Sequence, residues 1–306
     1  MVAWPWLEHS FSLLSSAAVS SRLHHALLIA GPEGMGKAEL ATTTVNGLLC
    51  DVNSDLVACG QCKSCKLTDA GTHPDFRYLS QANNGLSIDE IRSAISFVQK
   101  KSQIARNRVL WIEQAELMTE AASNAILKTL EEPAPGTFIV LTTAKKNQLL
   151  PTIVSRCFLI QLHPDWSDNA MQWLTNQAGQ QHDFGLLLKL AGGAPLTVMT
   201  WLNEGEVDLR AEVYRQFQAW QQDARQLKPL LNTLEGNDSV WSMLVILLSD
   251  LCQQLSTVRT PQHISALTDA LTQFEFHRQT VPGINKKLLL LSLMSAFDAA
   301  LHRPEK

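Results

Sequence analysis

The stretch that most constrains this chain is the glycine-rich loop Gly31-Pro-Glu-Gly-Met-Gly-Lys37-Ala38. Its frame is that of the phosphate-binding loop G-x-x-x-x-G-K-[ST], whose backbone N–H groups surround phosphates while the lysine reaches the outer ones. The last motif position supplies a hydroxyl to Mg²⁺, and Ala38 has none. An apolar run precedes the loop and a helix-compatible run follows it, so we expect an α/β fold. Gly31, Gly36 and Lys37 are expected to form a vestigial phosphate site that binds ATP weakly or not at all.

A second apolar run, Val109-Leu-Trp-Ile112, is typical of a buried strand and ends at Glu113-Gln114. In a P-loop ATPase of this type, the strand ends with an Asp that helps hold Mg²⁺, usually followed by a Glu that activates water. Glu113 has a longer side chain than Asp, and Gln114 cannot accept a proton. With Ala38, these departures predict that the chain does not hydrolyse ATP by itself. A working ATPase with unusual residues is the alternative.

Four of the six cysteines lie close together in the sequence: Cys50, Cys59, Cys62 and Cys65. Four thiolates with no open position are typical of a structural Zn²⁺ site. An iron–sulfur cluster is the alternative because thiolates also ligate those. Nothing nearby suggests electron transfer, so we predict one structural Zn²⁺. His73 could replace one thiol, but we expect a structural role for it.

The formal net charge is −4, from 25 basic and 29 acidic residues, which argues against a general nucleic-acid binder. Apolar runs such as Leu288–Met294 are short and fit buried helices, so no membrane partner is expected. The first residues, Met1-Val-Ala-Trp-Pro-Trp, lack the basic and apolar regions of a signal peptide. We therefore expect a cytoplasmic protein.

Residues 1–162 alternate strand-like and helix-like segments, which predicts a mostly parallel sheet covered by helices. The expected strands are Ala26–Ala30, Phe76–Leu79, Arg108–Ile112, Phe138–Thr142 and Phe158–Leu162. The expected helices are Lys37–Leu49, Ile88–Lys100 capped by Ser87 or Asp89, Ala121–Glu131 and Gln148–Ser155. After residue 162 the strand signal largely disappears, and we expect a small helical lid at 163–206 and an all-helical domain at 207–306.

The run Asn124-Ala-Ile-Leu-Lys-Thr-Leu-Glu-Glu-Pro133, followed by Ser155-Arg-Cys157, is the most family-specific part of the chain. Together with the P-loop frame and the four cysteines, it closely resembles the bacterial DNA polymerase III clamp-loader subunits, which are AAA+ proteins. The resemblance is strong over residues 1–162 and weaker beyond. It implies an AAA+ P-loop NTPase-like parallel sheet domain with a zinc-binding insertion, a small helical lid, and an all-α C-terminal collar domain that joins the oligomer.

The resemblance also implies a place in an assembly. The gamma/tau motor subunits keep an intact P-loop and acid pair, and an active lid carries an arginine after its glycine turn. Here that turn, Gly192-Gly-Ala-Pro-Leu-Thr-Val198, has none. The implied role is a non-hydrolysing subunit beside gamma/tau and delta subunits in a DNA polymerase holoenzyme. It would meet the sliding clamp (beta) weakly or indirectly, and primer–template DNA through the assembly.

By this resemblance, Arg156 with Ser155 would be an arginine finger that acts in trans on a neighbour's ATP, where its planar charged fork meets the γ-phosphate. The alternative is an exposed arginine that ends a helix and pairs with a carboxylate. A basic patch of Lys100, Lys101, Arg106 and Arg108 could contact DNA phosphates or be a solvated face.

Two other functions stay open at this point. One is an active AAA+ ATPase motor subunit of the same loader, and the other is a zinc-dependent DNA-binding module.

Overall fold

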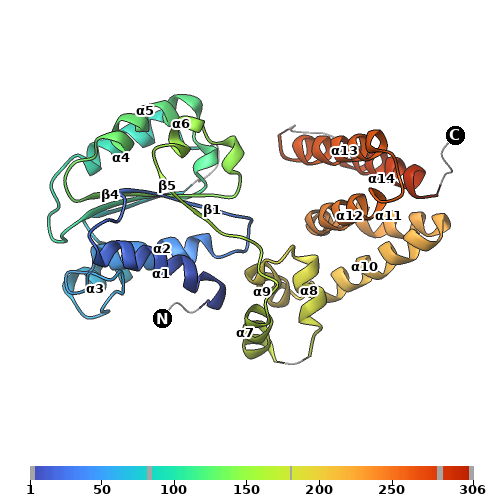
Figure 1. Cartoon of the computed structure of the whole chain (residues 1–306), viewed down its shortest axis with the longest axis horizontal. Coiled ribbons are helices and arrows are strands. Elements are labelled where there is room, and N and C mark those ends of the chain that lie inside the picture. The colour runs from blue at the N-terminus through green and yellow to red at the C-terminus, as the bar shows by residue number, and fades with distance from the viewer. Residues whose placement is uncertain (1–3, 81–84, 180, 281–284, 303–306) are drawn as a thin grey trace. The chain divides into compact units, whose positions relative to one another are not determined.

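The computed structural model describes residues 4–80, 85–179, 181–280 and 285–302, which form two compact units (Figure 1). The first unit comprises Met1–Gln177 with Ala194–Thr197, and the second comprises Ala178–Gly193 with Val198–Lys306. The division into three domains at residues 162 and 206 stays a prediction.

The first unit is built on a five-stranded sheet whose order is β2-β3-β4-β1-β5 and whose pairings are all parallel. Every residue of β1 and β3 is buried, as expected for parallel strands with helices on both faces. The strands are β1 Ala26–Ala30, β2 Phe76–Leu79, β3 Arg108–Ile112, β4 Thr137–Thr143 and β5 Phe158–Gln161. All five strands predicted from the sequence are confirmed, with small shifts at the ends of β4 and β5.

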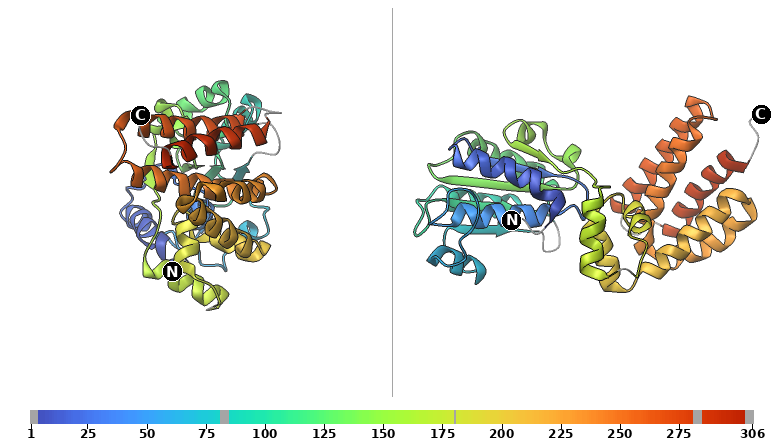
Figure 2. Two further views of the ribbon diagram at one scale, coloured as in Figure 1. Left: turned by 90° about the vertical axis from the view of Figure 1, so that its right-hand side faces the viewer. Right: turned by 60° about the horizontal axis from the view of Figure 1, so that its bottom comes forward.

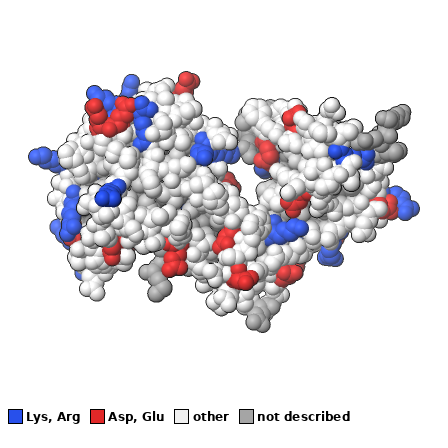
Figure 3. Space-filling model, in the orientation of Figure 1, with Lys and Arg blue, Asp and Glu red and all other residues white. Residues whose placement is uncertain are grey.

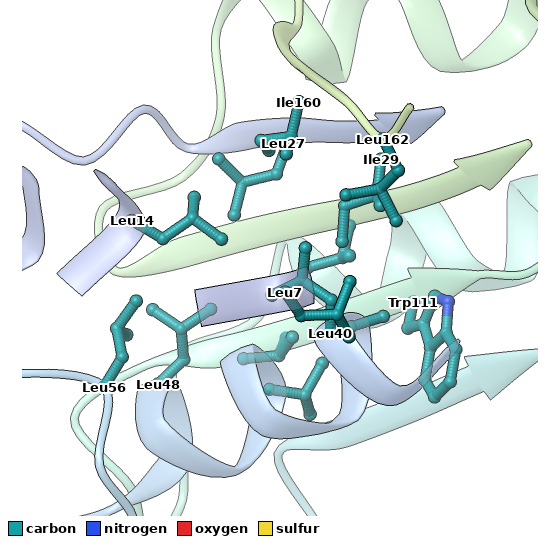
Figure 4. Packing of buried hydrophobic residues seen from close by; sticks show 14 of the residues in the cluster. Leu7, Leu14, Leu27, Ile29, Leu40, Leu48, Leu56, Trp111, Ile160 and Leu162 are labelled. Carbon is teal, nitrogen blue, oxygen red and sulfur yellow. The ribbon is translucent and has the colours of Figure 1, made fainter. Parts of the chain in front are cut away.

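Helices cover both faces of this sheet (Figures 1 and 2). Alternate residues of β1 divide between two cores, because Leu27 and Ile29 pack with α1 and α2 while Ala26 and Leu28 pack with α4, α5 and α6. The helices are α1 Glu8–Val19, α2 Lys37–Leu49, α3 Lys63–Asp69, α4 Ile88–Val98, α5 Glu120–Glu131, α6 Pro151–Val154 and α7 Asp168–Ala178. Figure 4 shows the α1–α2 side of the core.

The helix limits follow local chemistry. Ser87 begins α4 with a capping box, in which its hydroxyl accepts from Glu90 N at 3.3 Å and Glu90 Oε2 accepts from Ser87 N at 2.8 Å. The predicted cap at Ser87 is therefore confirmed, although α4 ends two residues before the predicted limit. The helices α1 and α3 were absent from the prediction, and the one predicted at 148–155 is shorter.

Every regular element described in the second unit is helical, which confirms the predicted all-α C-terminal region. The largest buried side chains there are aromatic, and the indole of Trp220 donates to Asp298 Oδ1 at 2.9 Å while that of Trp241 donates to Leu234 O at 2.8 Å. The helices are α8 Phe184–Leu190, α9 Pro195–Glu204, whose first residues belong to the first unit, α10 Val207–Gln222, α11 Leu227–Glu235, α12 Trp241–Leu255, α13 Pro261–Thr280 and α14 Lys286–His302.

Across the described ranges, no single helix is long and apolar enough to cross a membrane, and only α8 and α9 taken together as a bent pair reach that length and apolarity.

The prediction of a basic surface patch around residues 100–108 is wrong for one residue, Arg108. Arg108 is buried, and its Nη2 forms an ion pair with Asp75 Oδ1 at 2.9 Å while its guanidinium lies 4.5 Å from the centre of the Phe97 ring. A buried charge needs such a partner, so Arg108 is not available to meet DNA, whereas Lys100, Lys101 and Arg106 are exposed. On the face shown in Figure 3, basic and acidic side chains are interspersed, as on an ordinary solvated surface.

The buried carboxylate of Asp75 accepts hydrogen bonds from four groups. Its carboxylate accepts from the backbone N–H of Gln103, Ile104 and Ala105 at 2.7, 2.8 and 3.0 Å, besides Arg108. Burial alone would raise the pKa of Asp75, but these amides and the guanidinium lower it below its ordinary value. The ionised carboxylate therefore fixes the loop that leads into β3.

We expect Asp75→Asn to lower the free energy of unfolding by about 3 kcal/mol at pH 7, because it leaves the buried Arg108 without an opposite charge. Urea denaturation measures this, with the exposed Asp69→Asn as control, expected within about 0.5 kcal/mol of wild type. Because the folded pKa is depressed, the carboxylate's contribution is present above its unfolded pKa of about 3.9 and is lost as pH falls through the folded pKa. Equal stabilities at pH 7 would contradict the assignment.

Candidate functional site

The glycine-rich loop lies between β1 and α2, as the sequence predicts, and its glycines are required by the structure. Gly34 and Gly36 have φ of +71° and +87°. A Cβ at Gly34 would lie 2.0 Å from Thr197 Oγ1, and a Cβ at Gly36 would lie 2.9 Å from Leu7 Cδ1. The loop is therefore shaped by close neighbours as well as by its left-handed backbone.

The start of α2 keeps the features of an anion site. The first intrahelical hydrogen bond runs from Leu40 N to Gly36 O at 2.9 Å, so the N–H groups of Lys37 and Ala38 have no partner within the helix. Lys37 Nζ donates to Pro32 O at 2.7 Å. Burial lowers the pKa of Lys37, and nearby Glu33 acts in the opposite direction. The lysine is thus bonded to its own loop.

The carbonyl groups of the same loop are bonded to two other segments. Trp6 Nε1 donates to Met35 O at 3.0 Å, and Leu196 N donates to Gly34 O at 3.1 Å. Leu7 is fully buried beside α2 (Figure 4). The N-terminal segment and the first turn of α9 therefore both pack on the loop. Sequence reasoning missed these contacts, since it considered the lid turn only for its lack of an arginine.

The carboxylate at the end of β3 is tied to the neighbouring strand. The hydroxyl of Tyr78, in the edge strand β2, donates to Glu113 Oε2, and burial together with this bond raises the pKa of Tyr78. Tyr78 also packs on Trp111, with ring centres 4.8 Å apart. Gln114 has the left-handed φ of +52°. Glu113 is therefore held towards β2, and sequence reasoning gave no sign of this pairing.

The structure brings the four cysteines of the predicted metal site together. Their sulfur atoms all lie within 4.8 Å of one another, and Cys59 Sγ is 3.9 Å from Cys65 Sγ. A tetrahedral Zn²⁺ with Zn–S bonds of about 2.3 Å places its sulfurs about 3.8 Å apart. The donor set and its spacing fit a closed zinc site.

Local structure explains how the thiols meet. Cys50 directly follows α2, and Cys62 is the N-cap of α3, where its sulfur accepts from Cys65 N at 3.4 Å. Gly47 lets the insertion pack closely on α2, because a Cβ there would lie 2.1 Å from Leu56 O. His73 is outside the four-thiol group, and its Nδ1 accepts from the backbone N–H two residues on at 3.1 Å.

The thiols differ in acidity. Burial alone would raise the pKa of Cys50, but hydrogen bonds from the backbone N–H of Asn53, Cys59 and Val52 lower it to about 6. Burial and the neighbouring thiol of Cys62 raise the pKa of Cys65 to about 12. A bound Zn²⁺ would hold all four as thiolates, so metal binding releases protons.

Ser155 and Arg156 follow α6 and lie at the surface. Arg156 Nε donates to Glu131 Oε1 at 2.6 Å, and its Nη1 donates to Thr152 O at 2.9 Å. Ser155 is exposed, and its hydroxyl also donates to Thr152 O, at 3.2 Å. Arg156 therefore pairs with a carboxylate, as expected for an exposed arginine that ends a helix. Its side chain is nevertheless 32% exposed. Burial raises the pKa of the adjacent Cys157 to about 12.

Known proteins resemble this chain over most of its length. Residues 6–165 match the family described as "DNA polymerase III, delta subunit". The DNA polymerase III subunit delta′ of Escherichia coli K12 is 30% identical over 314 residues, covering 95% of this chain and 94% of that protein. The subunit delta′ of Pseudomonas aeruginosa is 36% identical over 214 residues, covering 69% and 64%. The subunit tau/gamma of Haemophilus influenzae is 33% identical over 156 residues, covering 51% and 22%. The chain belongs to the family of bacterial DNA polymerase III delta′ subunits.

Proposed function

We propose that this chain is the non-hydrolysing delta′ subunit of the DNA polymerase III clamp loader, a cytoplasmic assembly that loads the sliding clamp onto primed DNA during replication. The observation that carries the proposal is a surface arginine, Arg156, in a delta′ family member whose own phosphate loop lacks the hydroxyl that binds Mg²⁺. ATP would be hydrolysed in the site of a neighbouring subunit, and this chain would supply the positive charge of Arg156 to that site.

The chain's own site is poorly suited to hydrolysis. Ala38 offers no ligand to Mg²⁺, and Gln114 cannot take a proton from water. Glu113, which stands where a P-loop ATPase has its metal-binding Asp, accepts a hydrogen bond from the hydroxyl of Tyr78. Lys37 and the helical N–H groups remain, so weak binding of phosphate or nucleotide is retained in this proposal while turnover is not.

Arg156 would complete the ATP site of a neighbouring gamma/tau motor subunit. A guanidinium stays charged and presents a planar fork that matches phosphate oxygens. The guanidinium of Arg156 would stabilise the charge that develops on the γ-phosphate in the transition state. The other partners in the proposal are the delta subunit, the sliding clamp weakly or indirectly, and primer–template DNA through the assembly.

The four cysteines support a structural role for zinc in the same chain. Cys50 and Cys65 connect the end of α2 to α3, so a metal there would fix the insertion on the sheet domain. This favours neither alternative function. The net charge of −4 and the burial of Arg108 argue against a DNA-binding module. The absence of a hydroxyl at Ala38, where an active motor binds Mg²⁺, argues against an ATPase motor.

We expect the isolated chain to release no phosphate from ATP above the rate without protein, with or without primed DNA. Steady-state phosphate release measures this, and Lys37→Ala serves as the control because it removes the one phosphate-binding side chain that remains. Turnover of about 1 s⁻¹ or more, within the usual range for enzymes, that Lys37→Ala abolishes would show a working motor and reject the proposal.

A further inference from the structure

The guanidinium of Arg156 is held by an acidic side chain from another helix. Glu131 is the last residue of α5, and its Oε1 accepts from Arg156 Nε at 2.6 Å and pairs with Nη2 of the same group. The two side chains are 32% exposed for the arginine and 47% exposed for the glutamate. The pair thus lies where a neighbouring subunit can reach it.

The backbone under this pair is fixed. Ile126 and Leu130 of α5 share a buried cluster with Ile153 of α6. Glu131 therefore projects from a helix end that is packed against the helix preceding Arg156. An ion pair between two such anchored positions restricts the arginine more than one on a free loop would.

The contacts leave part of the guanidinium available. An arginine has five N–H donors in a planar fork. Glu131 takes the Nε–H and one N–H of Nη2, and Nη1 donates to Thr152 O at 2.9 Å and more weakly to Ser155 Oγ at 3.4 Å. An N–H of Nη2 on the side away from Glu131 remains for another acceptor.

We infer that Glu131 is a positioning residue for Arg156. It holds the Nε edge of the guanidinium and sets the direction in which the remaining N–H of Nη2 meets the neighbour's phosphate. This inference rests on the proposed function, because it needs Arg156 to act in trans. An arginine that is already ordered loses less side-chain freedom on binding, and a correctly aimed charge acts at once in the transition state.

The exposure of the pair argues against a blocking role. An ion pair between partly exposed side chains is weak. Glu131 therefore does not hold the guanidinium tightly enough to keep phosphate oxygens from binding to it. Removing the carboxylate should therefore loosen the arginine and not release it into activity.

The test uses the loader reconstituted with gamma/tau, delta and the clamp. We expect Glu131→Ala to lower kcat of the DNA- and clamp-stimulated ATPase about two- to fivefold with KM for ATP little changed. A misplacement of 1 Å can cost about 100-fold at one site, and the motor sites that do not meet Arg156 dilute the loss. Glu131→Gln keeps an acceptor oxygen and should lose less. The neighbouring exposed carboxylate supplies the matched control, Glu132→Ala, which should behave as wild type.

The decisive comparison is a double-mutant cycle. In an Arg156→Ala background, Glu131→Ala should have no further effect, because there is no guanidinium left to position. A purely structural role for Glu131 would instead give the same loss in both backgrounds. Thermal unfolding and gel filtration check that each variant folds and assembles, and the cycle is run with Glu131→Gln, similar in size, if Glu131→Ala fails to assemble.

Four results would overturn the inference. An increase in ATPase for Glu131→Ala would show that the carboxylate competes for the arginine. Wild-type rates for both Glu131 variants, or additive losses with Arg156→Ala, would remove its positioning role while leaving the proposed function intact. No effect of Arg156→Ala itself would instead reject the trans finger, and the inference with it.

Discussion

Arg156→Ala in the reconstituted loader is expected to lower the DNA- and clamp-stimulated ATPase and slow clamp loading, while the subunit still folds and assembles. An arginine finger supplies about 10³-fold or more to the rate at one site. The whole assembly should lose less, because motor sites that do not meet Arg156 are unaffected. The ATPase per loader and the rate of clamp loading are the two measurements.

The chemistry of the side chain gives this prediction a second test. Arg156→Lys should rescue poorly, because an ammonium keeps the charge but lacks the planar fork that binds two oxygens. Arg92, an exposed arginine of α4, provides the control, and Arg92→Ala should leave both rates unchanged. If Arg156→Ala loaders hydrolyse ATP and load clamps at wild-type rates, Arg156 is a structural residue that pairs with Glu131.

The sheet and the phosphate loop could be predicted because their signals are local. Buried parallel strands are continuous apolar runs, and the loop glycines are needed for backbone shape, so β1, β3 and α2 begin and end at the predicted residues. The cysteines meet because three of them share one short turn. The predicted fold class, a parallel α/β sheet domain followed by an all-helical C-terminal region, is confirmed by this topology and by the order of the elements.

The rest depended on residues far apart in the sequence. Arg108 looks like a surface charge beside its basic neighbours, but its buried guanidinium pairs with Asp75, 33 residues earlier in the sequence. Tyr78 lies 35 residues from Glu113 and meets it because β2 pairs with β3. Trp6 reaches the loop through one indole N–H. Such pairs carry no local pattern, so the packing around the vestigial site appears only in the fold.

Removing one thiol of the cysteine cluster should have the largest effect on the sheet domain's stability. Protein purified without chelator is expected to hold one Zn²⁺ per chain, and Cys62→Ser is expected to lose it. Structural zinc contributes directly to folding, so the variant should be destabilised by about 4 kcal/mol or more around the insertion. Metal analysis gives the stoichiometry, and hydrogen exchange over residues 50–71 gives the location of the loss.

A cysteine outside the cluster provides the control for this zinc prediction. Cys252 is a buried thiol of α12 in the other unit, and Cys252→Ser should keep the full complement of zinc. In Cys62→Ser, exchange in α10, α12 and α14 should stay slow, because those helices have a core of their own around Trp220 and Trp241. Wild-type protein that contains no metal would reject the site, and a coloured iron cluster would reassign it. Loss of protection throughout both units would show that the metal supports more than the insertion between α2 and α3.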